Sequence, residues 1–452
     1  MIRSSSIYVL CLAIIAATSG LLFGYDTAVV NGVLLFLRKE FALNNVQTET
    51  AASSLLVGCL IGAACAGFVG DRIGRKKSLM LSAFFFALST VVAATASNLT
   101  YFEIGRVVGG LAIGLASVLT PVYTSELAPA GRRGMLVSLN QLAIVVGILL
   151  AYFVDWRLAS FGDSSWRWML AAAGVPSLLF LFGLFFIPES PRWLAGQQRS
   201  IEARKVLGRL YGENQAAVLL SEIEAAANEE QGTWGEIFSR QMRKPLIIAL
   251  SLAFLCQVTG INAVLYYGSI VLVDHFGQLG PDVALAANVF IGLINLIATI
   301  AALFLIDRLG RRFMLLLGTC GMTLGLGILA VVSQLPQSSQ WLLFGGILGY
   351  VACFAIGMGP IPWVLISEIF PNKIRGRAAS LATAFLWIGT LLVTATFLNL
   401  KQTLGLSGVF GLYASLSLFS FLYILKEVPE TKGKSLEQIQ QIWELEDHGD
   451  HR

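Results

Sequence analysis

The sequence predicts an all-α membrane protein with twelve transmembrane helices, arranged as two pseudo-symmetric six-helix halves that short cytoplasmic helices join. Three observations predict this. Hydrophobic residues make up 56% of the 452 residues and charged residues only 13%, against roughly 45–50% and about 25% in soluble domains. Long apolar stretches recur from end to end, and the mean hydropathy is +0.74. Charged motifs repeat at a nearly constant offset. This composition excludes a secreted disulfide domain, a disordered chain and a nucleic-acid binder.

Twelve apolar segments are long enough to cross a bilayer, because a hydrocarbon core about 30 Å thick needs roughly 20 apolar residues per helix. The first six are expected at 7–37, 50–70, 78–97, 101–122, 135–154 and 166–187. The second six are expected at 245–273, 283–306, 313–333, 341–366, 378–399 and 408–425. The sequence therefore predicts an N-terminal bundle over 1–187 and a C-terminal bundle over 245–426.

A polar stretch over 188–244 separates the two bundles. Its charged residues recur at helical spacing and include Glu202, Arg204, Lys205, Glu222 and Glu224. This pattern favours short cytoplasmic helices that bridge the halves. A polar C-terminal tail is expected over 427–452.

Lys and Arg are distributed unevenly between the two sides of the predicted membrane. If the N-terminus is inside, five of the 31 basic residues are external and Arg106 lies within the fourth span, which leaves 25 on the cytoplasmic side. Cytoplasmic loops carry the excess of Lys and Arg in membrane proteins. We therefore expect a multi-pass protein of the cell's inner (plasma) membrane with both termini in the cytoplasm. The five external residues are Arg38, Lys39, Arg157, Arg167 and Lys401.

Three motifs of the first half recur in the second. DRIGRK (71–76) recurs as DRLGRR 236 residues later, SELAP (125–129) as SEIFP 242 residues later, and PES (188–190) as PET 241 residues later. Each motif follows the equivalent helix, so the chain is predicted to be a duplication of one six-helix unit. Parallel halves of this kind pack around a central cavity and rock to give alternating access.

The repeated motifs place acidic and basic residues together at cytoplasmic helix ends. Asp71 with Arg75, and Glu126 with Arg133, predict ion pairs that clamp the two halves when the inside is shut. The alternative is that the basic residues only anchor the topology, but the repetition of the acidic residues argues against it. The candidate gate residues are Asp71, Arg72, Arg75, Glu126, Arg133, Glu189, Arg192, Asp307, Arg308, Arg311, Glu368, Arg375 and Glu430.

These motifs resemble the signatures of the sugar porter family of the major facilitator superfamily, and the resemblance covers nearly the whole chain. They read GDRIGRK at 70–76, PESPRW at 188–193 and PETKG at 429–433. The first is shared across the superfamily, whereas the other two together are specific. The chain looks most like the bacterial proton-coupled xylose, galactose, arabinose and glucose transporters. The resemblance implies the major facilitator fold and a protein that moves a monosaccharide with a proton.

Asp26 and Arg106 are charges that lie away from the ends of the predicted spans, where a charge is costly and is a functional candidate. Asp26 is the only charge in the body of the first span, and Arg106 lies about six residues into the fourth. At 1.5 Å per residue both lie roughly 10–15 Å from the outer surface, so an ion pair between them is expected. The resemblance assigns proton coupling to Asp26, with Arg106 modulating it. The alternative is a static pair that holds two helices together.

Sugar recognition needs uncharged hydrogen-bonding groups and aromatic faces inside the spans. Asn262 and Tyr266 are one helical turn apart, and Gly260 allows the seventh helix to unwind near Gln257. The GMGPIP run at 357–362 is expected to break the tenth helix, and broken helices mark transporter binding sites. The alternative is that these amides and tryptophans only pack the core. The substrate-binding candidates, on helices that match the family's binding residues, are Phe23, Gln141, Gln257, Asn262, Tyr266, Asn295, Gly359, Trp363 and Trp387.

The sequence departs from the family at two positions near the expected sugar. Where relatives carry two consecutive Gln on the seventh helix, this chain has Cys256 and Gln257. Leu386 precedes Trp387 where an amide is common. An apolar wall discriminates weakly, whereas a site built for a hydroxyl rejects analogues that lack it. We therefore expect a different sugar or weaker binding.

Several other functions are excluded. The GKS at 433–435 resembles the end of a P-loop, but Val428 occupies the first glycine position. The six cysteines lack metal-ligand spacing and the three histidines lie at ends or loops, so no metal, cofactor or enzymatic activity is expected. The expected partners are a monosaccharide, a proton and membrane lipid, without nucleic acid, for a protein that functions as a monomer. A passive facilitator and a non-transporting sugar sensor remain alternatives to the symporter.

Overall fold

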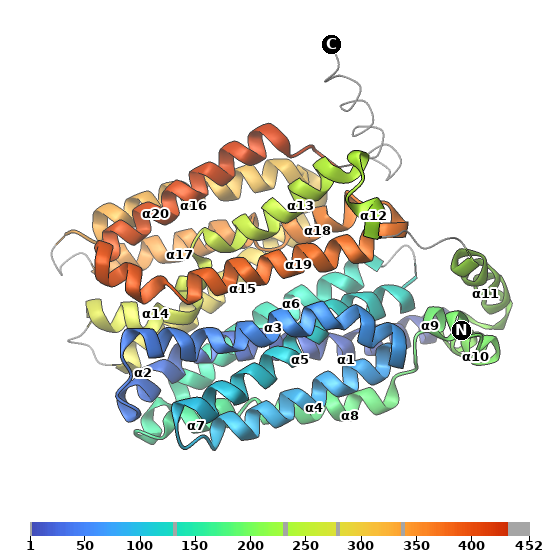
Figure 1. Ribbon diagram of the computed structural model, residues 1–452, viewed down its shortest axis with the longest axis horizontal. Helices are drawn as coiled ribbons and strands as arrows, with labels where there is room; N and C mark the ends of the chain where they lie inside the picture. The colour runs from blue at the N-terminus through green and yellow to red at the C-terminus, as the bar shows by residue number, and fades with distance from the viewer. Residues whose placement is uncertain (1, 130–132, 229–233, 277–280, 336–339, 433–452) are drawn as a thin grey trace, which may run out of the picture. The chain divides into compact units, whose positions relative to one another are not determined.

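The computed structural model describes residues 2–129, 133–228, 234–276, 281–335 and 340–432 (Figure 1). Within these ranges the chain is helical and has no strand. Twelve helical segments are long and apolar enough to cross a membrane, which confirms the predicted number of spans. Most of the predicted tail, from 433 onward, lies outside the described residues.

Two of the first six spans are broken helices. Val29 interrupts the first span, and the sixth is interrupted after Ala171. A 3-10 turn, η2 (Ala159–Phe161), follows the fifth span. The helices of this set are α1 (Ile2–Ala28) with α2 (Val30–Glu40), α3 (Asn45–Ile73), α4 (Arg75–Ala94), α5 (Leu99–Leu127), α6 (Arg133–Leu158), and α7 (Ser165–Ala171) with α8 (Gly174–Phe186).

The second six spans also contain two breaks, at the places where the sequence predicted them. The seventh span is interrupted at Thr259 and Gly260, and the tenth at 357–360. The last span kinks at Gly405, whose φ is 69°. The helices are α13 (Arg240–Val258) with α14 (Ile261–Phe276), α15 (Pro281–Leu309), α16 (Arg311–Val332), α17 (Gln340–Ile356) with α18 (Ile361–Glu368), α19 (Asn372–Thr394) and α20 (Phe397–Glu427).

The polar stretch between the two sets forms the predicted short helices. They are α9 (Pro191–Gly196), α10 (Ser200–Tyr211), α11 (Glu213–Asn228) and α12 (Trp234–Ile237). Ser190 caps α9 by accepting a hydrogen bond from the Trp193 amide at 3.2 Å, and Pro191 occupies the first turn, where its missing N–H costs nothing. Leu194, Ala195 and Ala203 form a small apolar core for α9, α10 and α11, so these helices are held by their own packing.

The chain divides into two compact units by contacts. Unit 1 comprises 1–26, 57–147 and 170–231, and unit 2 comprises 27–56, 148–169 and 232–452. The predicted bundles, 1–187 and 245–426, follow the sequence repeat and remain a prediction. The contact division differs because 27–56 and 148–169 form hydrogen bonds with the second set of helices inside unit 2, as described below.

Small residues allow helices of unit 1 to approach closely. Gly58 and Gly62 on α3 face Gly110 and Gly114 on α5: a Cβ at Gly62 would lie 2.5 Å from the Leu111 carbonyl oxygen. Such small-xxx-small pairs replace the hydrophobic driving force that is missing inside a bilayer.

Large apolar side chains point away from the packed interior of each unit. Phe182 and Phe186 on α8 are 69% and 71% exposed, and Phe304 on α15 is 73% exposed. Exposure of so much aromatic surface to water is unfavourable, whereas contact with lipid is not. The exposed face and the twelve apolar spans together describe a multi-pass membrane protein.

Candidate functional site

Asp26 and Arg106 form the expected ion pair inside unit 1. Arg106 Nη1 lies 2.8 Å from Asp26 Oδ1, and Arg106 Nη2 donates to the Asp26 carbonyl oxygen at 2.6 Å. Asp26 is 7% exposed and Arg106 is fully buried. Because one guanidinium binds both the carboxylate and the main chain of the same residue, it fixes the end of α1 as well as the charge.

The helices around this pair pack tightly against the Asp26 carboxylate. A Cβ at Gly109, one turn after Arg106 on α5, would lie 3.3 Å from Asp26 Oδ2 and 2.5 Å from Ser89 Oγ. Ser89 on α4 is itself buried. The glycine therefore lets α1, α4 and α5 converge on Asp26, and the second carboxylate oxygen lies in a close-packed pocket.

Gln257 and Asn262 face each other across the break in the seventh span. Asn262 Nδ2 donates to Gln257 Oε1 at 2.7 Å, and Gln257 Nε2 points to Cys256 Sγ at 3.4 Å. Gly260 has a φ of +98°, a conformation that favours glycine, and a Cβ there would collide with the ring of Tyr413. The break thus depends on glycine, and it brings the two amides together.

The break in the tenth span positions one of the predicted tryptophans. The Gly359 amide donates to the Phe354 carbonyl at 2.9 Å, which closes a turn, and α18 begins two residues later with Trp363 in its first turn. Trp363 is partly exposed, whereas Trp387 on α19 is 3% exposed. Trp387 lies two residues before Gly389, whose Cβ would lie 3.1 Å from Gln257 Cβ. Trp387 is therefore close in sequence to the contact between α19 and α13 at Gly389 and Gln257.

The remaining sugar-site candidates differ in burial and in unit. Tyr266 is fully buried and Asn295 is 6% exposed, both in unit 2. Phe23 and Gln141 are partly buried in unit 1. The structure thus brings Gln257 and Asn262 into contact, and the assignment of all these candidates to one sugar site remains a prediction.

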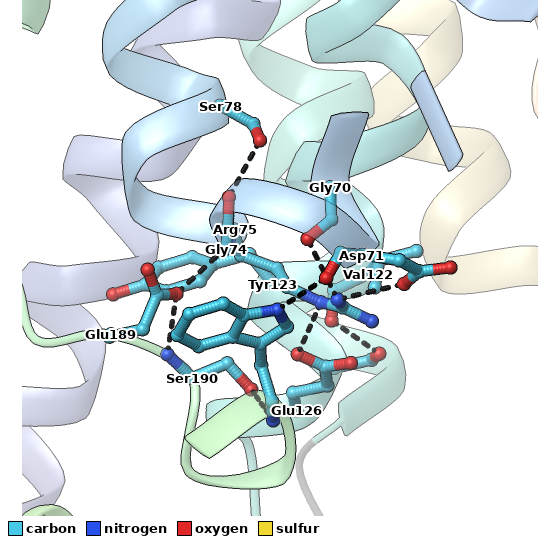
Figure 2. Close-up of polar contacts among 12 residues, drawn as sticks. Gly70, Asp71, Gly74, Arg75, Ser78, Val122, Tyr123, Glu126, Glu189 and Ser190 are labelled. Carbon is cyan, nitrogen blue, oxygen red and sulfur yellow. Dashed lines mark hydrogen bonds and ion pairs between the residues drawn. The ribbon is translucent and has the colours of Figure 1, made fainter. Parts of the chain in front are cut away.

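A charged network surrounds Arg75 in unit 1 (Figure 2). Arg75 Nη1 lies 2.9 Å from Asp71 Oδ1, and Arg75 Nε lies 3.3 Å from Glu126 Oε2. The indole of Trp193 on α9 donates to the Asp71 carbonyl at 2.9 Å. The network joins α3, α4, α5 and α9, so the first bridging helix is tied to the bundle by the same residues.

The corresponding network in unit 2 surrounds Arg311. Its side chain lies 3.0 Å from both Asp307 Oδ1 and Glu368 Oε1, and Thr431 Oγ1 donates to Glu368 Oε2 at 2.7 Å. Asp71, Arg75 and Glu126 therefore have the same arrangement as Asp307, Arg311 and Glu368. The predicted repeat is confirmed at the level of these side-chain contacts, and each network is formed within one unit.

Glu189 and Glu430 have a role that the sequence did not predict. Glu189 Oε1 accepts hydrogen bonds from the amides of Arg75 and Lys76 at 2.9 and 3.0 Å, which are the first two N–H groups of α4. The residue at the N-cap is Gly74, with a φ of +95°, and it offers no side chain. A distant carboxylate thus caps a helix whose own N-cap residue cannot, where the helix dipole also favours negative charge.

The second repeat has the same cap. Glu430 accepts from the amides of Arg311 and Arg312 at 3.0 and 3.1 Å, and Gly310 occupies the N-cap with the same φ of +95°. A Cβ at Gly310 would lie 2.6 Å from Glu430 Oε2. The same capping arrangement, a glycine at the N-cap and a glutamate distant in sequence, therefore occurs in both repeats.

We expect Glu189→Ala to lower the free energy of unfolding by about 1–2 kcal/mol, the cost of losing a helix cap. Thermal unfolding of the purified protein in detergent measures this. Glu202→Ala is the matched control. Glu202 forms an exposed ion pair with Arg199 at the start of α10, and the Arg199 guanidinium lowers the pKa of Glu202. Equal losses of stability in the two variants would contradict the capping role.

Among the described side chains, the other candidate gate residues lie outside the two charged networks. Arg72, Arg192 and Arg308 are exposed, and Arg72 lies over the ring of Phe68 at 5.7 Å from its centroid. Arg375 donates to the Phe370 carbonyl at 3.1 Å, which secures the start of α19. The side chain of Arg133 lies outside the described residues.

Sequence reasoning missed a hydrogen-bonded cluster in unit 2 that joins α2 to α14. Asn31 Nδ2 donates to the Leu265 carbonyl at 2.9 Å, and the Ser269 amide donates to Asn31 Oδ1 at 2.7 Å. Ser269 Oγ also donates to the Asn31 carbonyl. Asn31 is a fully buried polar residue within the first span, and that polarity was the available signal.

A second missed contact joins α3 to α20. Glu49, 2% exposed, accepts hydrogen bonds from the Asn399 amide at 2.9 Å and from Asn399 Nδ2 at 2.5 Å. Glu49 directly precedes the predicted second span, so it did not count as an intramembrane charge. Together with the Asn31 cluster, this contact explains why 27–56 belong to unit 2.

Comparison with known proteins agrees with the geometry. Residues 12–443 match the family model for "Sugar (and other) transporter". The chain is 37% identical to the arabinose-proton symporter of Bacillus subtilis (strain 168), over 98% of this chain and 96% of that protein. It is also 37% identical to the D-xylose-proton symporter of Escherichia coli (strain K12), over 98% and 97%.

Solved structures give the same result. The proton:xylose symporter XylE of the major facilitator superfamily, bound to 6-bromo-6-deoxy-D-glucose, superposes with a TM-score of 0.82 and 35% identity, over 97% of this chain and 100% of that one. Both the family model and these relatives cover nearly the whole sequence. The chain belongs to the sugar transporter family of the major facilitator superfamily, and it is a transporter rather than an enzyme.

Proposed function

We propose that this protein is a monosaccharide–proton symporter that works by alternating access of its two six-helix halves, 1–187 and 245–426. The buried pair of Asp26 and Arg106 carries the proposal, because an ionisable carboxyl group inside a span can bind and release a proton, which passive sugar transport does not require. Relatives named for symport of arabinose, xylose and galactose with protons support the same function.

Asp26 is the proton carrier in this proposal. In the arrangement described, Arg106 neutralises the Asp26 carboxylate at 2.8 Å. If a conformational change during alternating access moves Arg106 away from Asp26 within the first half, the carboxylate is left in an apolar environment and takes up a proton. Return of Arg106 displaces that proton on the other side, so protonation follows the access state.

The sugar site is proposed around the two broken helices of unit 2. The amide of Gln257 uses its oxygen for Asn262, while its N–H group points at a thiol, which is a weak acceptor. A sugar hydroxyl is a stronger acceptor and would replace the thiol. Trp363 and Trp387 would supply the aromatic faces for the ring, with Phe23, Gln141, Tyr266, Asn295 and Gly359 completing the site.

Gln257→Ala is expected to weaken sugar binding by about 1–3 kcal/mol, because a hydroxyl and the Asn262 amide both lose their partner. Calorimetric titration with D-xylose, L-arabinose, D-galactose and D-glucose measures this. Gln215→Ala removes an exposed amide on α11 and is the control. Unchanged binding of all four sugars by Gln257→Ala would exclude Gln257 from the site.

We further propose that the protein lies in the cell's inner membrane with both termini on the cytoplasmic side. The distribution of Lys and Arg supports this orientation. It would place the Arg75 and Arg311 networks at the cytoplasmic side, and we propose that they hold the two halves together there when the inside is shut. We expect the protein to function as a monomer in lipid. Labelling of single cysteines placed in the loops, with a membrane-impermeant reagent, tests the orientation.

Uptake into proteoliposomes tests the proposed function. With an inward proton gradient, wild-type vesicles are expected to accumulate at least one of the four monosaccharides above the external concentration. Without the gradient they should only equilibrate it. Equilibration in both conditions would make the protein a passive facilitator, and no sugar movement in either would favour a sensor.

A further inference from the structure

A second buried carboxyl group lies in unit 2, outside the machinery described so far. Asp155, near the end of α6, is fully buried. Its Oδ2 accepts a hydrogen bond from the Gly32 amide of α2 at 3.1 Å. Its Oδ1 is buried and has no hydrogen-bond partner among the described residues. Asp155 therefore differs from Asp26, whose charge is matched by an arginine.

The pocket around Asp155 is closed by a tight helix contact. A Cβ at Gly32 would lie 2.5 Å from Asp155 Cγ, so only glycine lets α2 approach the carboxyl group this closely. The neighbouring residue, Asn31, holds α14 through Leu265 and Ser269. Two adjacent residues of α2 thus bind its two neighbours: the Gly32 amide binds Asp155 on α6, and the Asn31 side chain binds α14.

Among the described residues, the helices packed around Asp155 bring no counter-charge to it. On α6, Tyr152 donates its hydroxyl to the Leu265 carbonyl at 3.2 Å, and Arg157 stacks on Trp156. The charged residues of α2, α14 and α15 at this end are engaged elsewhere or exposed: Arg38 with Asn45, Lys39 with Asp163, Glu40 with Arg167, Asp274 with Lys401, and Asp282 at the exposed start of α15.

We propose that Asp155 is a second proton-binding site: its carboxyl group is protonated while α2 is packed against α6 and α14, and it releases that proton when α2 separates from them. Burial without a cation strongly disfavours an ionised carboxylate. The neutral acid retains Oδ2 as the acceptor for Gly32 and carries the proton on Oδ1. On separation, water reaches the group, the O–H bond breaks, and the proton passes to the solvent or buffer while the carboxylate keeps the electron pair.

The consequence is that pH biases the contact between α2 and α14. A proton bound only in the packed arrangement favours that arrangement at low pH, and each unit of rising pH shifts the equilibrium away from it by up to about tenfold. Neutralising Asp155 permanently should remove this dependence. The inference about protonation stands without the proposed transport function, whereas its effect on transport rests on it.

Infrared spectroscopy of the purified protein tests the protonation directly. In an Asp26→Asn background, the carbonyl stretch of a buried protonated acid is expected near neutral pH, and the further change Asp155→Asn should remove it. Asp163→Asn, an exposed carboxylate paired with Lys39, should leave the band unchanged. A spectrum in which Asp155→Asn removes no acid band would overturn the proposal.

The neutral isostere also serves as a folding test. Because asparagine keeps an oxygen for the Gly32 amide and carries no charge, Asp155→Asn should fold as well as wild type by thermal unfolding. Failure to fold would mean that an ionised group is required there, which also overturns the proposal.

The pH dependence of sugar exchange, measured at equal sugar concentrations on both sides, tests whether protonation of Asp155 affects transport. In Asp26→Asn vesicles the exchange rate should still change with pH, and Asp155→Asn should make it pH-independent. Exchange that keeps its pH profile in the double variant would assign the effect to another group. Absence of any exchange in wild type would instead count against the proposed transport function, and the infrared result would still decide the protonation of Asp155.

Discussion

Asp26→Asn is expected to abolish accumulation of sugar above equilibrium in vesicles with an inward proton gradient. Asparagine retains the shape of the side chain but carries no titratable proton, so sugar movement is no longer coupled to the gradient. Exchange of labelled sugar at equal concentrations should persist, because Asp26 itself is not among the proposed sugar contacts. Uptake of radiolabelled sugar into proteoliposomes measures both.

The matched control is Asp163→Asn, which removes an exposed carboxylate paired with Lys39. It should accumulate sugar as wild type does. If Asp26→Asn vesicles still concentrate sugar, the proton is carried by another residue.

The second large effect is expected for Arg106→Gln. This change leaves the buried Asp26 carboxyl group without its cation and removes the bonds to Asp26 Oδ1 and to its carbonyl, at 2.8 and 2.6 Å. Breaking a buried pair by removing one partner costs about 3–5 kcal/mol of unfolding free energy. Active uptake should fall as well, because proton release from Asp26 is no longer controlled. Thermal unfolding in detergent gives the stability change.

A double variant separates the charge from the packing. Adding Asp26→Asn to Arg106→Gln removes the orphaned carboxylate and should recover a large part of the lost stability. Lys39→Gln, at the exposed pair with Asp163, should cost only about 0–1 kcal/mol. A double variant that is as unstable as Arg106→Gln alone would show that the loss comes from the main-chain bond rather than from the charge.

Much of the fold could be predicted because the bilayer imposes length and polarity on each span. The twelve spans, the bridging helices and the breaks at Gly260 and at 357–360 followed from apolar length, helical spacing and glycine or proline. The break at Val29 did not, because neither residue type marks it. It accompanies the hydrogen bonds of Asn31 with α14, which join segments more than 230 residues apart and which local sequence does not encode.

The ion pair of Asp26 and Arg106 could be predicted because two charges at similar depth in apolar helices have few other ways to be satisfied. Asp155 and Glu49 follow the same logic, yet each lies one residue outside a predicted span, since hydropathy places span ends only approximately. The capping roles of Glu189 and Glu430 could not be predicted. They depend on how the loops after the sixth and twelfth spans return to the starts of α4 and α16, which is a matter of tertiary packing.

The most direct test of the central claim is to record proton movement driven by sugar alone. Proteoliposomes with a pH-sensitive dye inside, without a gradient or a membrane potential, receive external D-xylose or whichever of the four sugars is transported. The account predicts that wild type acidifies the interior as sugar enters and that Asp26→Asn takes up sugar with no change in internal pH. Sugar entry through wild type without acidification would contradict proton coupling.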